Sequence, residues 1–351
     1  MTALDDLQNI KKIDRRHLAK YIADFPSHCA KALLGMEKIK IPDDWKKTEK
    51  IAVCGMGGSA IGGDLAKAVL PTKEKMPVSV IRGDDLPAWV DAKTLVVCVS
   101  CSGETEETIS CFKQALEKKA MIFAVAGGGQ LAALAKKNKI PLYEFSCQAP
   151  PRASLGYLLV PLLVLWEKIG FLSPEDADLR PTLAFLEEFG ANLAPGQPTQ
   201  DNLAKQLAFA VFDRLPLIVG AGLLASVARR WKTQFNENAK TISFFEELPE
   251  LNHNTVEGLA YPRRIKDDLL VLLLESPSDP SRVRRRFQIL KKLLAREAVE
   301  FQEISASGAD ILTQKLSLVF LGDWISFYLA VLNGTDPSSV ENIPWIKKLL
   351  R

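Results

Sequence analysis

The chain has 351 residues, of which 47% are hydrophobic and 25% are charged, a composition typical of a globular protein of roughly two domains. Its net charge of +3 is too small for a strong attraction to nucleic acid or to an anionic membrane. Its three histidines, at positions 17, 28 and 253, cannot form the short spacings of a histidine-rich metal site, so we expect no metal.

The N-terminus, MTALDDLQNIKKIDRRH, has early acidic residues and lacks the apolar core of an export signal. The most apolar stretch, residues 153–166, is too short to span a bilayer and contains Gly156 and Pro161. The six cysteines form no CxxC pair with ligand partners, and several fall in predicted strands, so we expect reduced thiols. These features favour a cytoplasmic protein.

After an N-terminal helical segment, residues 1–48, the hydrophobic pattern alternates between strands and helices. The expected elements are a strand at 51–55, a helix at 59–70, strands at 78–81 and 95–100, a helix at 104–118, a strand at 121–126, a helix from 130 and a strand at 140–145. Strands that alternate with helices form parallel sheets. The pattern therefore predicts a first α/β domain at residues 49–170.

Residues 171–200 are expected to form a helical connection that ends in the loop APGQPTQ, whose two prolines make it a plausible joint between the halves. A second α/β series follows at residues 201–335, before a C-terminal tail at 336–351. Its expected elements are a strand at 217–220, a helix from 223 to about 240, a strand at 269–275, a basic helix, a strand at 298–304 and a helix at 315–332.

The basic run RVRRRFQILKK, residues 282–292, could suggest a nucleic-acid contact. However, Val283, Phe287, Leu290 and Leu294 fall on one helical face, which leaves the arginines and lysines on the other. We therefore expect a solvated helix face and no nucleic-acid partner.

The glycine-rich segment GMGGSA, residues 55–60, lies between a predicted strand and a predicted helix. Such a turn directs backbone N–H groups and a positive helix end at one point, which favours an anion. The segment also fits the dinucleotide fingerprint G-x-G-x-x-G/A, and Asp84 and Asp85 follow the next strand. A nicotinamide-dependent oxidoreductase is therefore one interpretation.

A second turn, VSCSGETEET at residues 99–108, is rich in hydroxyl groups and also lies between a strand and a helix. Ser59 on the first turn, with Ser100, Ser102 and Thr105 on the second, could surround one phosphate monoester. A dinucleotide site leaves this second turn unexplained. The plain structural alternative is that these hydroxyl groups only cap helices.

Five motifs, in this order along the chain, resemble the bifunctional phosphoglucose/phosphomannose isomerase family of the sugar isomerase (SIS) superfamily: GMGGSAIGGD, SCSGETEET, PR at 151 and 152, QFNENAK at 234–240 and LPELNHNTVEG at 248–258. The resemblance covers residues from about 50 to the C-terminus. It implies two SIS-type subdomains, at 49–170 and 201–335, each a parallel β-sheet flanked by α-helices. It also implies an aldose–ketose isomerase without cofactor or metal, and a homodimer with active sites at the subunit interface.

The resemblance assigns Glu237 as the base that moves a proton between C1 and C2, and Arg152 as the cation that stabilises the enediolate. It assigns ring opening to His253, which would reach the active site of the partner subunit, assisted by a lysine of the tail. Lys347 fits the family pattern better than Lys348. The phosphate is assigned to Gly57, Gly58, Ser59, Ser100, Ser102 and Thr105.

A non-catalytic regulator that binds sugar phosphates through the same fold is the main alternative. In such a protein Glu237, His253 and the tail lysine would have no joint role. Glucose 6-phosphate and mannose 6-phosphate are both open as substrates, because they differ only in one stereocentre at C2.

Overall fold

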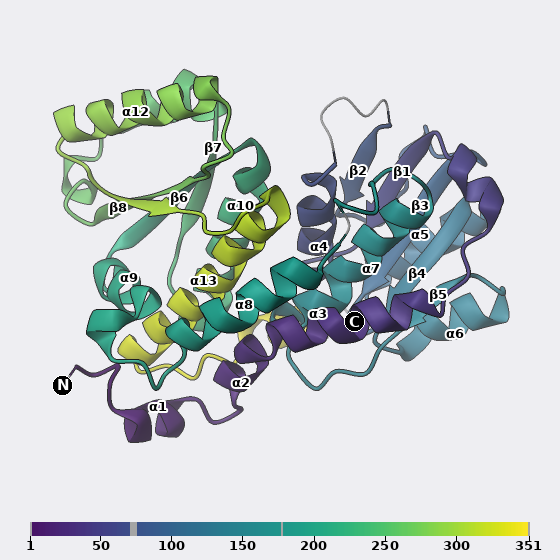
Figure 1. Ribbon diagram of the computed structural model, residues 1–351, viewed down its shortest axis with the longest axis horizontal. Helices are drawn as coiled ribbons and strands as arrows, with labels where there is room; N and C mark the ends of the chain where they lie inside the picture. Colours follow the sequence, from purple (N-terminus) through teal and green to yellow (C-terminus); the bar gives the residue numbers. More distant parts are fainter. Residues whose placement is uncertain (1, 71–75, 177, 350–351) are drawn as a thin grey trace. The chain divides into compact units, whose positions relative to one another are not determined.

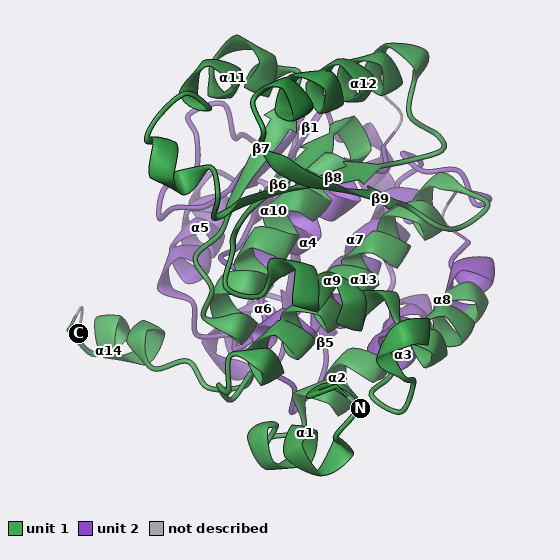
Figure 2. Cartoon of the chain, turned by 90° about the vertical axis from the view of Figure 1, so that its left-hand side faces the viewer, with its two compact units in different colours: residues 1–23, 184–351 green, residues 24–183 purple. Residues whose placement is uncertain are grey.

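The computed structural model describes residues 2–70, 76–176 and 178–349, and the chain forms two compact units (Figures 1 and 2). Unit 1 comprises residues 1–23 and 184–351, and unit 2 comprises residues 24–183. The first boundary follows a short N-terminal helix, and the second falls within a helix. The loop at 194–200, where a joint was expected, lies inside unit 1. Each unit is built on one parallel sheet.

Unit 2 contains a five-stranded sheet in the order β2-β1-β3-β4-β5, with every neighbouring pair parallel. Its strands are β1 (Lys50–Cys54), β2 (Val78–Ile81), β3 (Thr94–Ser100), β4 (Met121–Ala126) and β5 (Leu142–Glu144). The central strand β3, TLVVCVS, is buried at every residue, which is the pattern of a strand covered on both faces. Its β-branched and apolar side chains explain why the sequence alone identifies it.

The helical segments described with this sheet are α3 (Phe25–Glu37), η1 (Asp43–Lys47), α4 (Gly58–Lys67), α5 (Glu106–Glu117), α6 (Gly129–Lys137), η2 (Pro151–Ala153) and α7 (Leu155–Lys168). α7 packs on α3 and α4, and a Cβ added to Gly62 of α4 would lie 3.1 Å from the carbonyl oxygen of Leu158 in α7. The absence of a side chain at Gly62 thus lets the two helices approach closely.

Unit 1 contains a four-stranded parallel sheet in the order β7-β6-β8-β9. Its strands are β6 (Leu215–Ala221), β7 (Phe244–Leu248), β8 (Leu269–Glu275) and β9 (Glu300–Ser305). Its helical segments are α1 (Leu7–Ile13), α2 (Leu18–Ala23), α8 (Arg180–Leu193, which begins in unit 2), η3 (Thr199–Asp201), α9 (Leu203–Val211), η4 (Gly222–Leu224), α10 (Ala225–Gln234), η5 (Phe235–Ala239), η6 (Glu250–His253), α11 (Thr255–Gly258), η7 (Arg263–Ile265), α12 (Ser281–Arg296), α13 (Ile311–Leu332) and α14 (Asn342–Leu349).

The predicted parallel α/β architecture is confirmed, but the sequence analysis missed strand β7. Its sequence, FFEEL, places two adjacent glutamates in a strand that pairs only with β6 at the edge of the sheet. An edge strand does not need the continuous apolar run that identified β3 and β8. The missed strand therefore lies where burial is incomplete.

The basic helix is confirmed as a solvated face. α12 buries Phe287, Leu290 and Leu294 against the sheet of unit 1, and Val283 packs at the edge of the same cluster. Arg282 and Arg285 are exposed. The apolar face thus accounts for the position of this helix.

One helix of the described residues, α13, is long and apolar enough to cross a membrane by length and composition alone. It is longer than α7, which contains most of the apolar stretch at 153–166. However, 94% of its apolar window is buried inside the protein, which is the pattern of a core helix.

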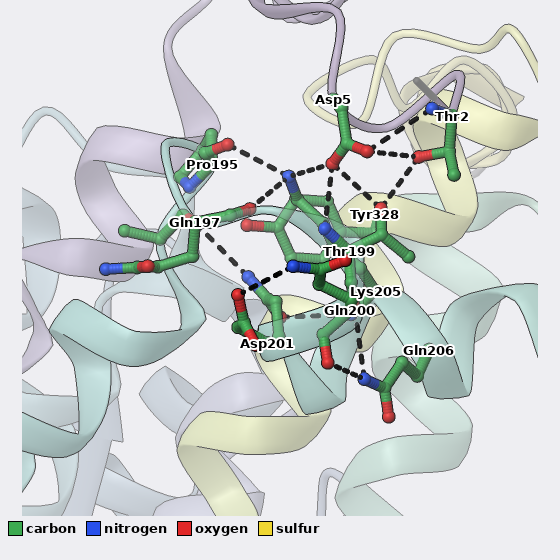
Figure 3. Close-up of polar contacts among 12 residues, drawn as sticks. Thr2, Asp5, Pro195, Gln197, Thr199, Gln200, Asp201, Lys205, Gln206 and Tyr328 are labelled. Atoms are coloured by element: carbon green, nitrogen blue, oxygen red, sulfur yellow. Dashed lines mark hydrogen bonds and ion pairs between the residues drawn. The ribbon is translucent and has the colours of Figure 1, made fainter.

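The loop at 194–200 is held by a buried lysine (Figure 3). Lys205 of α9 donates hydrogen bonds to the carbonyl oxygens of Pro195, at 2.9 Å, and Gln197, at 2.7 Å. Its ammonium nitrogen also lies 3.2 Å from Oδ1 of Asp5, which in turn accepts from the N–H and hydroxyl groups of Thr199. The N-terminal segment and the loop are therefore joined through one cation.

Candidate functional site

The two turns of unit 2 follow neighbouring strands at the same edge of the sheet. β1 ends at Cys54 and pairs in register with Cys98, two residues before the end of β3. From β1 the chain continues to β2 on one side, whereas from β3 it continues to β4 on the other. This reversal is the topological switch point at which open parallel sheets bind ligands.

The first turn leaves open backbone in front of helix α4. Gly57 has φ = +51°, a conformation that strongly favours glycine, and a Cβ at this position would meet no atom within 4 Å. Ser59 is only 4% exposed, and its hydroxyl group makes no hydrogen bond within the part of the chain that the structure describes. The turn therefore offers a polar side chain and N–H groups to a ligand.

The second turn is organised by its own hydroxyl groups. The Ser100 hydroxyl accepts a hydrogen bond from the Gly103 N–H at 3.0 Å and lies 2.9 Å from the Thr105 hydroxyl. Ser102 accepts from the N–H of Glu104 at 3.2 Å. Thr105 precedes helix α5 but its side chain makes no capping hydrogen bond. Capping alone therefore does not explain Thr105.

Arg152 lies beside the first turn. It occupies the short helix η2 and is 4% exposed. A Cβ added to Gly58 would lie 3.1 Å from the carbonyl oxygen of Pro151 and 3.6 Å from Cα of Arg152, so only glycine permits this approach without a shift. Unit 2 thus brings the arginine segment to the turn that is expected to hold the phosphate.

Cys101 lies between the two serines of the second turn and is half-buried. Burial raises the pKa of its thiol to about 11, against a smaller opposing effect of Ser154. The thiol is therefore protonated near neutral pH and is not an active nucleophile. This agrees with a structural position for Cys101.

Glu237 lies in a π-helical turn, η5, that directly follows α10 in unit 1. Trp231 and Phe235 on the same helical run are fully buried, as the sequence predicts, and Glu237 itself is half-buried. Single π turns within helices are often functional. The wide turn is the feature that sequence analysis missed, because it was expected to be a regular helix to about residue 240.

The other two assigned residues of unit 1 are exposed. His253 ends the short helix η6, and Lys347 lies in α14, a helix with no buried residue. Glu237, His253 and Lys347 thus belong to three separate segments. Among residues 2–70, 76–176 and 178–349, no group of three His, Cys, Asp or Glu side chains is arranged to hold a metal ion.

The sequence missed the side chains that anchor the π turn. Asn236 accepts a hydrogen bond from Ser243 at 2.6 Å, and Asn238 donates one to Ser326 at 2.9 Å. The two asparagines on either side of Glu237 were a visible signal of this arrangement. Their partners are separated from them by 7 and 88 residues, respectively, so the longer contact could not be found from local sequence.

Comparisons with known proteins identify the family of the chain. Residues 200–350 match a family described as the bacterial phospho-glucose isomerase C-terminal SIS domain. The bifunctional phosphoglucose/phosphomannose isomerase of Caldicellulosiruptor bescii is 36% identical over 330 residues, which cover 94% of this chain and 97% of that protein. The protein of the same name from Aquifex aeolicus is 34% identical, over 89% of this chain and 93% of its own.

A solved structure has the same fold over almost the whole length. It is a glucose-6-phosphate isomerase like protein from Thermus thermophilus, with a TM-score of 0.66 and 21% identity, covering 99% of this chain and 100% of its own. At this identity the similarity shows the fold alone. Because curated relatives above 30% identity extend over most of both sequences, the chain belongs to the bifunctional phosphoglucose/phosphomannose isomerase family.

Proposed function

We propose that this chain is an aldose–ketose isomerase that interconverts glucose 6-phosphate, mannose 6-phosphate or both with fructose 6-phosphate. The observation that carries the proposal is the match to bifunctional isomerases over 94% of the chain. The two hydroxyl-bearing turns at one switch point support it, since they suit a compact dianion.

In this mechanism the phosphate is bound by the backbone at Gly57 and Gly58 and by the hydroxyl groups of Ser59, Ser100, Ser102 and Thr105. The Ser100–Thr105 contact fixes the second turn before the ligand arrives. Such preorganisation lowers the entropy cost of binding. The sugar is thereby held by an end that does not react.

The reaction itself requires proton transfer between adjacent carbons. Glu237 would take the proton from C2 of the aldose or C1 of the ketose and return it to the neighbouring carbon. Arg152 would stabilise the negative charge of the enediolate, because its guanidinium keeps its charge and can direct two donors at adjacent oxygens. No step needs a metal or an organic cofactor.

Ring opening would fall to His253, supplied by the partner subunit of a homodimer, with assistance from Lys347. Imidazole suits this step because it can both give and accept a proton near neutral pH. A reaction that ends at fructose 6-phosphate would serve glycolysis and gluconeogenesis in the cytoplasm. Lys347 is preferred to Lys348.

The test is a coupled assay of fructose 6-phosphate formation from each aldose phosphate, with and without EDTA. Turnover of either sugar that EDTA leaves unchanged supports the proposal, and turnover of both supports the bifunctional form. Absence of turnover combined with retained sugar-phosphate binding, measured by calorimetry, would instead identify a non-catalytic regulator.

The placement of His253 can be tested by subunit complementation. Glu237→Gln and His253→Asn homodimers should each be inactive, whereas a mixture refolded from equal amounts should regain about a quarter of the native sites, because half of the dimers are mixed and each holds one intact site. No recovery, with mixed dimers present by mass spectrometry, would place His253 in the site of its own subunit.

A further inference from the structure

The π turn that contains Glu237 ends in carbonyl groups that a regular helix would leave without partners. The carbonyl oxygens of Glu237 and Asn238 each accept a hydrogen bond from Nζ of Lys240 at 3.1 Å. The carbonyl oxygen of Ala239 accepts from the side-chain amide of Asn333 at 2.9 Å. Three successive carbonyl groups are therefore held by side chains.

Lys240 also ties this turn to the segment after α13. Its Nζ donates to the carbonyl oxygen of Asp336 at 2.7 Å. An ammonium group has three N–H donors, which matches the three carbonyl groups that accept from Lys240. A cation at this place also complements the negative end of the helix.

The backbone at Lys240 takes the conformation that this contact requires. It has φ = +56° and ψ = +24°, the left-handed region, which costs a non-glycine residue roughly 1 kcal/mol. A glycine would avoid this cost but could not reach the three carbonyl groups. The left-handed backbone at Lys240 is thus strained, and the hydrogen bonds of its side chain to the turn offset this strain.

The flanking side chains hold the turn from its other sides. Ser243 donates to the side chain of Asn236 and to the carbonyl oxygen of Lys232, while the amide of Asn238 donates to Ser326 in α13. Asn238, Ser243 and Ser326 are at most 1% exposed. The peptide unit that bears Glu237 is thus fixed on both sides.

We propose that Lys240 is a positioning residue for the reaction, which fixes the peptide of Glu237 and so aims its carboxylate at the proton between C1 and C2. This inference rests on the proposed function, because it takes Glu237 as the base. It assigns Lys240 no contact with the sugar. The phosphate turns lie in unit 2, so loss of Lys240 should affect the chemical step more than binding.

The experiment compares Lys240→Met with the native enzyme, using the aldose phosphate that the native enzyme converts. Methionine keeps the chain length and the Cβ, so the backbone strain is the same in both proteins. A displacement of about 1 Å at the reacting group can cost up to about 100-fold in rate. We expect kcat to fall about 10- to 100-fold with KM changed by less than about twofold.

Rescue by a conservative variant provides a readout that separates positioning from a general loss of stability. Lys240→Arg keeps a cation with several N–H donors near the same carbonyl groups, so it should recover part of the kcat that Lys240→Met loses, with kcat expressed per folded protein as measured by circular dichroism. Ser243→Ala, a smaller change that releases Asn236, should lower kcat in the same direction but by less, and it serves where Lys240→Met folds poorly.

Lys168→Met is the matched control. Lys168 also donates to two backbone carbonyl groups, those of Met36 and Ile39, each at 2.8 Å. It lies in unit 2, at the far end of α7 from Arg152, roughly 20 Å along a helix of this length. Lys168→Met should lower the melting temperature but leave kcat per folded protein at the native value.

The outcomes separate this inference from the proposed function. If Glu237→Gln is inactive but Lys240→Met keeps kcat within about twofold of native, Lys240 does not position the base, and the isomerase assignment stands. If both lysine variants lose kcat equally, the effect is one of stability and the inference fails. A native protein without isomerase turnover would overturn both.

Discussion

Replacement of Lys205 by methionine should strongly destabilise unit 1. The side chain of Lys205 is fully buried, and its ammonium group contacts Asp5, Pro195 and Gln197 and lies 5.6 Å from the centre of the Tyr328 ring (Figure 3). Methionine has a similar volume, so the substitution removes the charge and donors without leaving a large cavity. The expected loss is therefore electrostatic rather than steric.

The size of the stability loss depends on how well the Asp5 carboxylate is satisfied once Lys205 is removed. Removal of one member of a buried ion pair costs about 3–5 kcal/mol. The side chain of Asp5 is 19% exposed and keeps hydrogen bonds from Thr2 and Thr199, so its carboxylate remains solvated in part. We therefore expect Lys205→Met to lower the free energy of unfolding by about 3 kcal/mol, the lower end of that range.

The assay is urea unfolding followed by circular dichroism, with Lys205→Met, Asp5→Asn and the double variant forming a cycle. The two single losses should sum to at least about 1 kcal/mol more than the loss in the double variant, because the second substitution removes a charge that has already lost its partner. The exposed Lys12→Met in α1 is the control, with a change within about 0.5 kcal/mol. A loss below about 1 kcal/mol for Lys205→Met, or additive single losses, would refute the argument.

The same pair gives a pH dependence with a definite sign. Burial acts to raise the pKa of Asp5, but hydrogen bonds from Thr199, Thr2 and Lys205 together hold it well below its ordinary value. A carboxyl group whose pKa is lower in the folded state stabilises that state above its unfolded pKa of about 3.9 and loses this contribution as the pH falls. The native protein should thus have a higher free energy of unfolding than Asp5→Asn at pH 6, and this difference should decrease as the pH falls below about 4. If the difference in free energy of unfolding stayed constant from pH 6 to below pH of about 4, the Asp5 carboxylate would not stabilise the folded state in this way.

Three further substitutions test the turns and the basic helix. Gly103→Ala should lower the free energy of unfolding by about 3 kcal/mol in urea, since Gly103 has φ = +70° and its Cβ would lie 1.8 Å from the carbonyl oxygen of Gly128; a native-like value would contradict this packing. Thr105→Val should raise KM about 10- to 150-fold with little change in kcat, equivalent to one lost hydrogen bond to a charged group, and an unchanged KM would remove Thr105 from the phosphate site. Arg285→Ala should change stability by less than about 0.5 kcal/mol in the same urea assay, and a larger loss would show that α12 needs this charge.

The sequence could predict the parts of the fold in which local pattern and burial agree. β3 and β8 are continuous apolar runs because helices cover both faces of their sheets, and β2, β4 and β8 begin and end where the pattern predicts. β7 was missed because an edge strand tolerates Glu246 and Glu247. Local pattern therefore identifies strands to the extent that both faces are buried.

For the site, the sequence indicated residue types but could not give their surroundings. The choice between capping and ligand binding at Thr105 depended on whether its hydroxyl turned toward the α5 backbone or toward Ser100, which is a tertiary question. Lys240, whose side chain contacts the π turn at Glu237, also donates to the carbonyl oxygen of Asp336, which is 96 residues away. Contacts over such separations have no local signal, which is why a regular helix was expected there.

The two units also show why the backbone alone does not specify the site. β6 of unit 1 ends at Ala221, and the next residue, Gly222, has φ = +46°, close to the +51° of Gly57 in unit 2. Both turns thus have a glycine with a similar positive φ after the first strand of a sheet. The difference between the two turns lies in the side chains that come next.

In unit 2 those next residues are Gly58 and Ser59, which place a hydroxyl group and no apolar side chain at the turn. In unit 1 they are Leu223 and Leu224, the latter 1% exposed. An apolar side chain at this point removes both the polar group and the space that an anion needs. α4 then continues as a regular helix, while α10 of unit 1 passes into the π turn that bears Glu237. Turns after the first strand of each sheet thus carry different side chains, so the chemistry that each turn can perform follows its side chains rather than the fold.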